Sequence, residues 1–258
     1  MVWHYREAGA GRPLILLHGI GMSHAAWHPV FPLLSATRRV IAFDVAGFGE
    51  SKPLPRGTPP TLSNLVDSLV RSMRELDLSV PVDLVGNSLG GALALEAARR
   101  GIARSVVAIS PAGLWRDHPS AHVGWVFSGM RFLATRLPLM MKATARVAPL
   151  RAIAFTVPLS PESWRMPVND ARRAFDDLAA ATAFEATFEH TRTPFRGSTI
   201  TAPVTIAFGD RDWILREGSR RRDAVPAHTR WVVGHGWGHV PMWVDPVGVS
   251  RLILDGTQ

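Results

Sequence analysis

Ser88 stands in the stretch GNSLGG (86–91), with glycines two positions before and two positions after it. An apolar run, typical of a buried strand, ends just before this stretch, and residues 89–100 have the composition of a helix. A sharp strand-to-helix turn needs small residues at 86 and 90, because the two backbones come close together there. Such a turn lifts a serine hydroxyl above the edge of a sheet, where it can act as a nucleophile.

A nucleophilic serine needs a base, and the base needs a third group that orients it. We favour His239 as the base, in the loop after the last predicted strand, over His235, which ends that strand. We favour Asp212 as the acid over Asp210, because Asp212 lies farther into the loop after its strand. Ser88, Asp212 and His239 then follow three different strands.

Short apolar runs predict the strands and helices that position these three residues. Near-continuous apolar runs indicate strands that are covered on both faces, as in a parallel sheet. Residues 62–76 repeat apolar side chains at helical spacing. Alternating strands and helices predict an α/β fold with a doubly wound, mostly parallel sheet. The predicted strands are residues 13–19, 38–44, 81–87, 103–110, 203–210 and 229–235.

Residues 114–200 interrupt this alternation. They are rich in Trp, Phe, Leu, Met, Ala and Arg, contain several prolines, and include no convincing strand. Prolines end helices, so this segment is expected to form several short ones. We therefore predict a core domain made of residues 1–113 and 201–258, with a helical cap inserted at 114–200.

Together, five motifs resemble those of the α/β-hydrolase fold superfamily, and the resemblance covers nearly the whole chain. The motifs are LHGIG (17–21), DVAGFGES (44–51), GNSLGG (86–91), GDRD (209–212) and GHVP (238–241). Ala46 departs from the proline that many relatives have before the Gly-Phe-Gly turn. The resemblance implies a helical cap over the site, as at 114–200.

The resemblance also implies an oxyanion hole. In such relatives, backbone N–H groups after the His-Gly pair and after the nucleophile bind the oxyanion of acyl transfer. These positions are Ile20 and Leu89 here, with Gly21 as a substitute for Ile20. His18 is expected to hold this loop in place. Each donor is expected to contribute about 3 kcal/mol of transition-state stabilisation.

Hydrolysis of carboxylic esters through an acyl-enzyme is the activity that a serine triad favours. Relatives that cleave carbon–halogen bonds or epoxides carry aspartate at the nucleophile position, and Ser88 argues against both. A carbon–carbon bond hydrolase of vinylogous diketones is the alternative that the resemblance implies, because such relatives often carry an asparagine at the position of Asn87 and a tryptophan at that of Trp243, four residues after His239. That reaction would also require a cap arginine, for which Arg165 is a candidate. The third hypothesis is a binding protein that has the hydrolase fold but catalyses no reaction.

Substrate choice is expected to depend on the cap. The stretch 122–141 mixes aromatic, methionine and arginine side chains, which suit a broad apolar pocket for medium-sized acyl groups. The pocket is predicted to include Gly21, Asn87, Trp125, Met130, Trp164 and Trp243.

The composition of the chain limits the partners, cellular location and cofactors that we expect. The net charge is +8, but 27 of the 29 basic residues are arginines scattered along the chain, which argues against a nucleic-acid partner. There are no cysteines, no secretory signal and no transmembrane stretch, so a cytoplasmic enzyme with a small-molecule substrate is expected. GFGES (47–51) lacks the third glycine of a dinucleotide site, and no metal or cofactor is implied.

Overall fold

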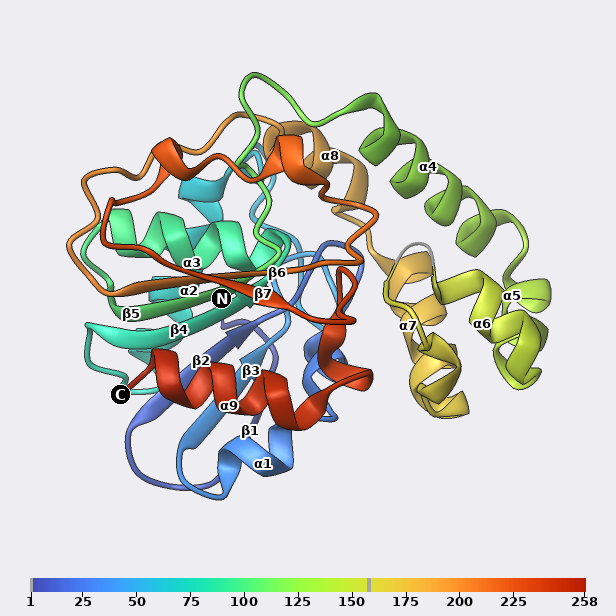
Figure 1. Cartoon of the computed structure of the whole chain (residues 1–258), viewed down its shortest axis with the longest axis horizontal. Helices are drawn as coiled ribbons and strands as arrows, with labels where there is room; N and C mark the ends of the chain where they lie inside the picture. The colour runs from blue at the N-terminus through green and yellow to red at the C-terminus, as the bar shows by residue number, and fades with distance from the viewer. Residues whose placement is uncertain (1, 157–158) are drawn as a thin grey trace.

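A computed structural model describes residues 2–156 and 159–258 (Figure 1). Its centre is a seven-stranded sheet in the order β1-β3-β2-β4-β5-β6-β7. All neighbouring strands run parallel except β1, which pairs antiparallel with β3 at one edge. The strands are β1 (Tyr5–Ala8), β2 (Pro13–Leu17), β3 (Arg39–Phe43), β4 (Val82–Asn87), β5 (Ala103–Ile109), β6 (Val204–Gly209) and β7 (Arg230–Gly234).

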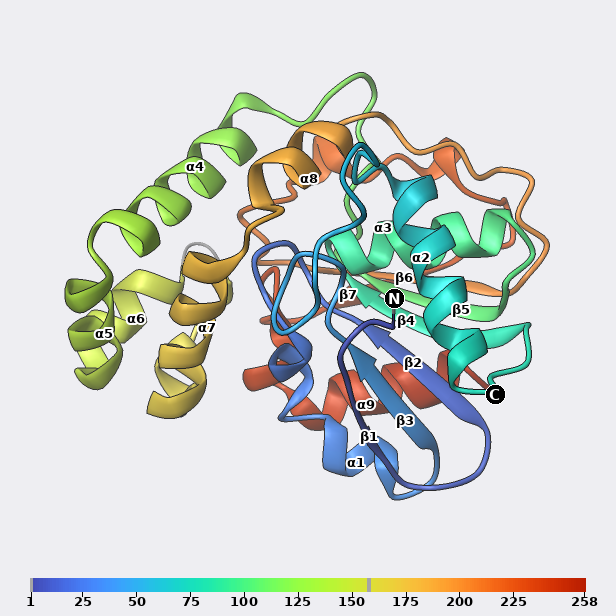
Figure 2. The same cartoon turned by 180° about the vertical axis from the view of Figure 1, so that it is seen from behind.

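Each face of the sheet has its own hydrophobic core. Along β2, Ile15 and Leu17 pack into one core, while Leu14 and Leu16 pack into the other. Alternate side chains of a strand point to opposite faces, so a continuous apolar run fills both cores. Helices α2 (Leu62–Glu75) and α3 (Leu89–Arg99) cover one face. Helices α1 (Phe31–Ser35) and α9 (Pro246–Gly256) cover the other (Figures 1 and 2).

The predicted fold class is confirmed: helices flank a mostly parallel sheet, and all six predicted strands are present within two residues of their expected limits. The sequence analysis missed β1, because its residues YREA are polar and only half-buried. This edge strand contributes few side chains to either core. Strand β7, at the other edge, is also partly exposed, although its apolar sequence indicated a strand covered on both faces.

A helical segment connects β5 to β6. It contains α4 (Ala121–Arg136), α5 (Pro138–Arg146), α6 (Ala148–Thr156), α7 (Val168–Ala180) and α8 (Phe184–His190). The described part of residues 114–200 contains no strand. Helix α7 lies between the sheet domain and the pair α5 and α6, which form the outer end of the segment (Figures 1 and 2). The boundaries 114 and 200 remain predictions.

None of the described helices is long and apolar enough to cross a membrane.

Candidate active site

Ser88 occupies a strained turn between β4 and α3. Its backbone has φ +54° and ψ −114°, and a positive φ of this kind is rare for non-glycine residues. The chain has to turn directly from strand to helix, and Ser88 is the single residue between them. Strain of this kind costs roughly 1–3 kcal/mol and persists only where the surrounding structure enforces it.

The glycines around Ser88 make this turn possible. A Cβ atom at Gly86 would lie 2.1 Å from the backbone of Gly90, and one at Gly90 would lie 2.0 Å from the carbonyl oxygen of Leu17. The predicted close approach of strand and helix is therefore present. It brings Ser88 to the carboxyl edge of the sheet, between β2 and β5.

His239 and Asp212 form a buried pair at the same edge. Asp212 follows β6 and His239 follows β7, and Nδ1 of the histidine lies 3.0 Å from Oδ2 of the aspartate. The other carboxylate oxygen, Oδ1, accepts the backbone N–H groups of Ile214 and Leu215, both at 2.9 Å. The aspartate can thus accept a hydrogen bond from a protonated Nδ1 of His239 and hold the imidazole in one orientation.

The electrostatics of Asp212 favour its ionised form. Burial alone would raise the pKa of its carboxyl group. The charge of His239, the hydrogen bond from His239 and the hydrogen bond from the N–H of Leu215 together outweigh burial. They leave the pKa of Asp212 below its ordinary value. The lowered pKa favours the carboxylate form of Asp212, which suits a group that orients a base.

The alternatives Asp210 and His235 lie together, but on the surface. Nδ1 of His235 is 3.4 Å from Oδ2 of Asp210, and the His235 side chain is 90% exposed. Asp210 also accepts the N–H of Gly236 and so fixes the turn after β7. Burial separates the two pairs, because Asp212 and His239 are both 4% exposed. The buried pair has the geometry expected of catalytic groups, and the exposed pair stabilises a turn.

Asn87 links the serine turn to the histidine loop. Its Nδ2 donates to the carbonyl oxygen of His239 at 2.8 Å and to that of Ile109 at 3.1 Å. Nε2 of His239 is buried and has no hydrogen-bond partner in the described part of the chain. No Ser88–His239 hydrogen bond joins the side chains among the described residues, and in unliganded sites such bonds are often long. Nε2 is thus available to receive a proton.

His18 shapes the loop after β2. The N–H of Val45 donates to its Nε2 at 2.9 Å, so the proton of the neutral ring lies on Nδ1, which donates to the carbonyl of Gly19 at 2.7 Å. Burial lowers the pKa of His18, which keeps the ring neutral. The loop-holding role expected for His18 therefore has a specific hydrogen-bond arrangement behind it.

Two backbone N–H groups remain free near Ser88. Leu89 is the first residue of α3, where helical N–H groups have no intrahelical acceptor, and Ile20 lies in the loop that His18 holds. Within the described residues, neither N–H has a hydrogen-bond acceptor. Both residues line the pocket that contains Ser88. This arrangement has the donors that an oxyanion requires.

The pocket at Ser88 is small and apolar. Its cavity volume is about 30 Å³, which gives room for about two water molecules. The helical segment supplies Val123 and Phe127 from α4 and Phe188 from α8. The remaining lining comes from loops at the sheet edge and includes Ala112, Trp115, Pro119, Thr191, Arg192, Ile214 and Leu215.

The other predicted pocket residues do not line this cavity. Trp125 is 79% exposed and lines an outer groove, and Trp164 is about half exposed and lies against Arg165. Met130 packs at the margin of a core. Trp243 is buried and donates to Asp170 of α7 at 3.0 Å. Asn87 is the hydrogen-bonding residue described above.

Gly21 contacts the helical segment instead of the cavity. Its φ is +73°, and an added Cβ would lie 2.6 Å from Leu178 of α7. The composition of the cap predicts Trp125 and Met130 as pocket residues but does not say which face of α4 is buried. The helical period of α4 could have identified its inward face, because Val123 and Phe127 lie four residues apart on it.

Sequence reasoning missed two residues of the helical segment that hold the histidine loop. Oγ of Ser160 accepts the N–H of Gly238 at 2.9 Å, and the carbonyl of Leu159 accepts the N–H of Val240 at 2.9 Å. These bonds lie on either side of His239. No motif marks either residue, because the contact depends on how the helical segment folds back onto the sheet domain.

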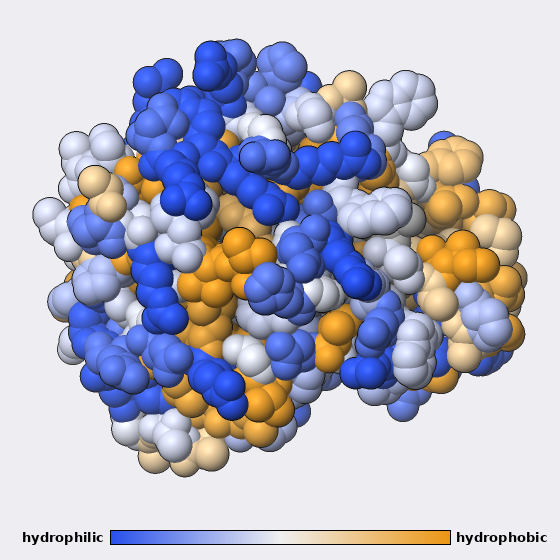
Figure 3. Space-filling model, viewed as in Figure 1, coloured by the Kyte–Doolittle hydropathy of each residue, from blue (hydrophilic) through white to orange (hydrophobic). Residues whose placement is uncertain are grey.

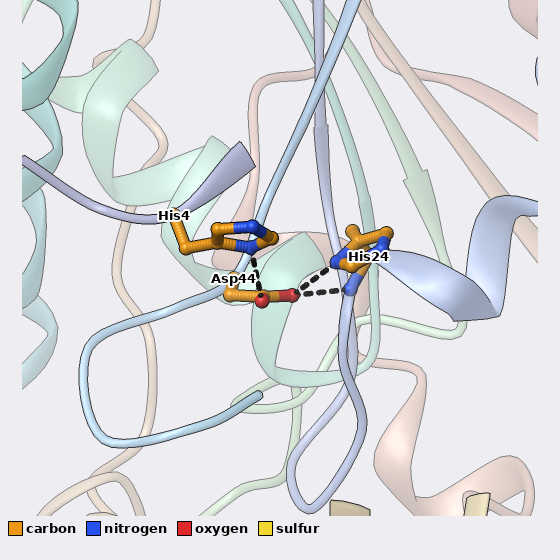
Figure 4. Close-up of side chains that lie close together, drawn as sticks. All are labelled: His4, His24 and Asp44. Carbon is orange, nitrogen blue, oxygen red and sulfur yellow. Dashed lines mark hydrogen bonds and ion pairs between the residues drawn. The ribbon is translucent and has the colours of Figure 1, made fainter. Parts of the chain in front are cut away.

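A cluster of His4, His24 and Asp44 also lies at this edge of the sheet (Figure 4). Nδ1 of His4 and Nδ1 of His24 lie 2.8 and 2.9 Å from the two oxygens of Asp44. The N–H groups of His24 and Glu50 donate to the same oxygens. Burial acts to raise the pKa of Asp44, but the hydrogen bonds from His24 and Glu50 and the charge of His18 keep it far below its ordinary value. These hydrogen bonds explain why the three side chains lie close together, and they hold the loop after β3 in place.

Comparisons with known proteins match this architecture. The α/β hydrolase fold family matches residues 12–246. The (E)-2-((N-methylformamido)methylene)succinate hydrolase of Acinetobacter baylyi is 39% identical over 34% of this chain and 32% of its own length. The 2-hydroxy-6-oxo-2,4-heptadienoate hydrolase of Pseudomonas putida is 44% identical over 36% of this chain and 34% of its own. The chain thus aligns with about a third of each of these two relatives.

A solved structure extends the likeness to the whole fold. An esterase from Thermogutta terrifontis superposes with a TM-score of 0.72, covering 98% of this chain and 91% of the esterase at 22% identity. At this identity the superposition shows a common fold.

Proposed function

Because the chain belongs to the α/β hydrolase fold family, we propose that it is a serine hydrolase that cleaves carboxylic esters of small to medium apolar substrates. The single observation that carries the proposal is the buried His239–Asp212 pair. This pair leaves Nε2 of the histidine unpartnered at the sheet edge where the strained turn presents Ser88.

Each residue has a defined role in the reaction. Nε2 of His239 takes the proton of the Ser88 hydroxyl as its oxygen attacks the ester carbonyl. The N–H groups of Ile20 and Leu89 bind the resulting oxyanion. The tetrahedral intermediate then breaks the bond to the alcohol, which leaves with the proton from His239. A water molecule, activated by the same histidine, hydrolyses the acyl-enzyme and restores Ser88.

The lining of the cavity supports an apolar acyl group. Phe127, Phe188 and Ile214 line the same cavity as Ser88, and no acidic residue lines it in the described part of the chain. At about 30 Å³ the cavity is too small for an ester. Substrate binding therefore requires the lining of this cavity, which includes side chains of α4 and α8, to rearrange.

Ester hydrolysis is tested by incubating wild-type and Ser88→Ala protein with 4-nitrophenyl esters from acetate to decanoate. The proposal expects turnover with an optimum in the medium chain lengths and a loss of at least about a thousandfold in the variant. A fluorophosphonate reagent should label the wild type once, and peptide mass spectrometry should find the label on Ser88. Wild-type protein that neither turns over an ester nor reacts with the reagent would contradict the proposal and favour a binding protein.

Arg192 favours a second candidate, hydrolysis of a carbon–carbon bond in a vinylogous diketone that carries a carboxylate. Arg192 lines the cavity of Ser88, and its side chain pairs only with the exposed Glu189, at 3.1 Å, among the described residues. Trp115 fixes its backbone by donating to the Arg192 carbonyl at 2.7 Å. Arginine binds carboxylates well, and the P. putida relative acts on a substrate with both a carboxylate and a conjugated ketone.

The two candidates differ in what Arg192→Gln should do. For 2-hydroxy-6-oxo-2,4-heptadienoate, the variant should raise KM at least about tenfold, whereas KM for a neutral ester should stay unchanged. Arg196→Gln, at an exposed arginine outside the cavity, is the matched control. Wild-type protein that hydrolyses esters but leaves the dienoate intact would exclude the second candidate.

A further inference from the structure

The outer side of the helical segment exposes an unusual number of apolar side chains. More than half of the exposed large apolar residues in the described chain lie between positions 125 and 153. Leu139 is 82% exposed and Ile153 is 73% exposed. We call this set the outer apolar surface: Trp125, Phe132, Leu133, Leu137, Leu139, Met140, Val147, Leu150 and Ile153.

The outer apolar surface lies on α4, α5 and α6, away from the sheet domain. Figure 3 shows apolar side chains gathered at the right-hand end of the molecule, over α5 and α6. Helix α4 has two apolar faces. Val123 and Phe127 line the cavity of Ser88, whereas Trp125 and Phe132, seven residues apart and thus on one helical face, are exposed.

The charge of this region has one sign. Residues 118–161 contain five arginines and lysines and no aspartate or glutamate. Arg131 and Lys142 pair with Glu185 and Asp176 from neighbouring helices. Arg136 and Arg146 are exposed, and the described residues include no ion-pair partner for either. Two unneutralised cations thus adjoin the exposed apolar side chains.

The geometry points to a docking surface for an anionic lipid bilayer, with α4, α5 and α6 lying against the headgroups. Apolar and aromatic side chains flanked by cations are the features that hold helices at a membrane interface. A symmetric dimer through the same surface would bring the cations of two copies together without compensating acids. An uncharged apolar partner would leave Arg136 and Arg146 unpaired. An anionic lipid surface satisfies both the apolar side chains and the charges.

Docking in this orientation would also place the lipid surface next to the active site. An outer groove contains Trp125 and shares Pro119, Phe188 and Arg192 with the cavity of Ser88. Helix α4 thus contacts the proposed membrane on one face and the cavity on the other. The inference does not depend on the proposed reaction, because adsorption to lipid requires no turnover.

Vesicle co-sedimentation tests this inference directly. Wild-type and Ser88→Ala protein should both bind vesicles that contain about 30% phosphatidylglycerol, and should bind pure phosphatidylcholine at least about tenfold more weakly. Binding should weaken as salt is raised. The double variant Leu139→Glu/Ile153→Glu should reduce binding at least about tenfold, and Arg136→Glu/Arg146→Glu should reduce it similarly.

Matched variants on the sheet domain provide the control. Val247→Glu and Arg251→Glu make the same two kinds of substitution at single exposed residues of α9, each with half the charge change of the corresponding double variant, and should leave binding within about twofold. Unchanged circular dichroism and an unchanged urea unfolding midpoint would show that each variant is folded. The inference is overturned if the wild type binds no vesicle. It is also overturned if Val247→Glu weakens binding as much as the Leu139 and Ile153 changes do, or if light scattering finds a dimer that those changes dissociate.

Discussion

Oγ of Ser160, in the helical segment, accepts a hydrogen bond of 2.9 Å from the N–H of Gly238, the residue before His239. The two residues are 78 positions apart in the sequence and both lie in the interior. An added Cβ on Gly238 would come within 2.4 Å of the Cα of Ser160, so the two backbones are also in close contact. The helical segment therefore lines the cavity and also holds the loop that carries the candidate base, His239.

Ser160→Ala should impair catalysis through this loop. The buried N–H of Gly238 would lose its acceptor, at a cost of about 1–3 kcal/mol in the free energy of unfolding. Because the loop carries His239, kcat for a 4-nitrophenyl ester should fall about tenfold, while KM changes little. Ser250→Ala is the control, because Ser250 is a buried serine whose hydroxyl has no partner in the described residues. Equal effects of the two variants on kcat would contradict the positioning role.

Asp212→Asn and Asp210→Asn should differ sharply. An amide at 212 would present an N–H or a weaker acceptor to His239 and favour the wrong tautomer, so kcat should fall by about 10⁴. Asp210 binds the exposed His235 and the N–H of Gly236, so its amide variant should retain kcat within about twofold. Steady-state kinetics on one ester compare both variants. Loss of activity in Asp210→Asn alone would assign the acid to the exposed pair.

Local sequence patterns predicted most of the sheet and the tight turn at Ser88, the candidate nucleophile. The turn at Ser88 follows from Gly86 and Gly90, whose lack of side chains is required by contacts within a few residues or with the adjacent strand. Asp212 and His239 follow strands that their own apolar residues define. Such features are encoded close to where they act, so a single sequence reveals them.

The cavity could not be predicted in the same way. Its wall depends on how α4 and α8 pack over the sheet edge, which no local pattern specifies. Trp125 and Phe127 are two residues apart and similar in type, yet one is exposed and the other lines the cavity. The residue type of Trp125 suits an apolar pocket, but residue type does not show whether a side chain faces the cavity or the solvent. The face of α4 that is buried decides between them, and that face is fixed only by tertiary packing.

Asn87→Ala should separate the serine turn from the histidine loop. The variant removes the donor to the carbonyls of His239 and Ile109, both in the interior, and should cost about 1–3 kcal/mol in the free energy of unfolding. Asn64→Ala is matched to it, because Asn64 also donates to a carbonyl, that of Pro59, but on the exposed surface. Urea denaturation should find a change below about 0.5 kcal/mol in the control. Equal destabilisation by the two variants would argue against the link.

His18 should make the fold less stable in mild acid. Burial lowers the pKa of His18 from its ordinary 6.5, so the unfolded chain binds this proton at a higher pH than the folded protein does. The contribution is therefore fully present above pH 6.5 and is lost as the pH falls below that value. One proton limits the slope to about 1.4 kcal/mol per pH unit.

His18→Asn isolates this contribution to stability. Urea denaturation between pH 8 and pH 5 should find a lower free energy of unfolding at pH 8, because the bonds to Gly19 and Val45 are weakened. The fall with decreasing pH should be shallower than in the wild type, since the titrating group is gone. The lowered pKa of Asp212 acts in the same direction only below about pH 4, outside this window. Parallel stability curves for the two proteins would mean that the folded protein binds the His18 proton as readily as the unfolded chain.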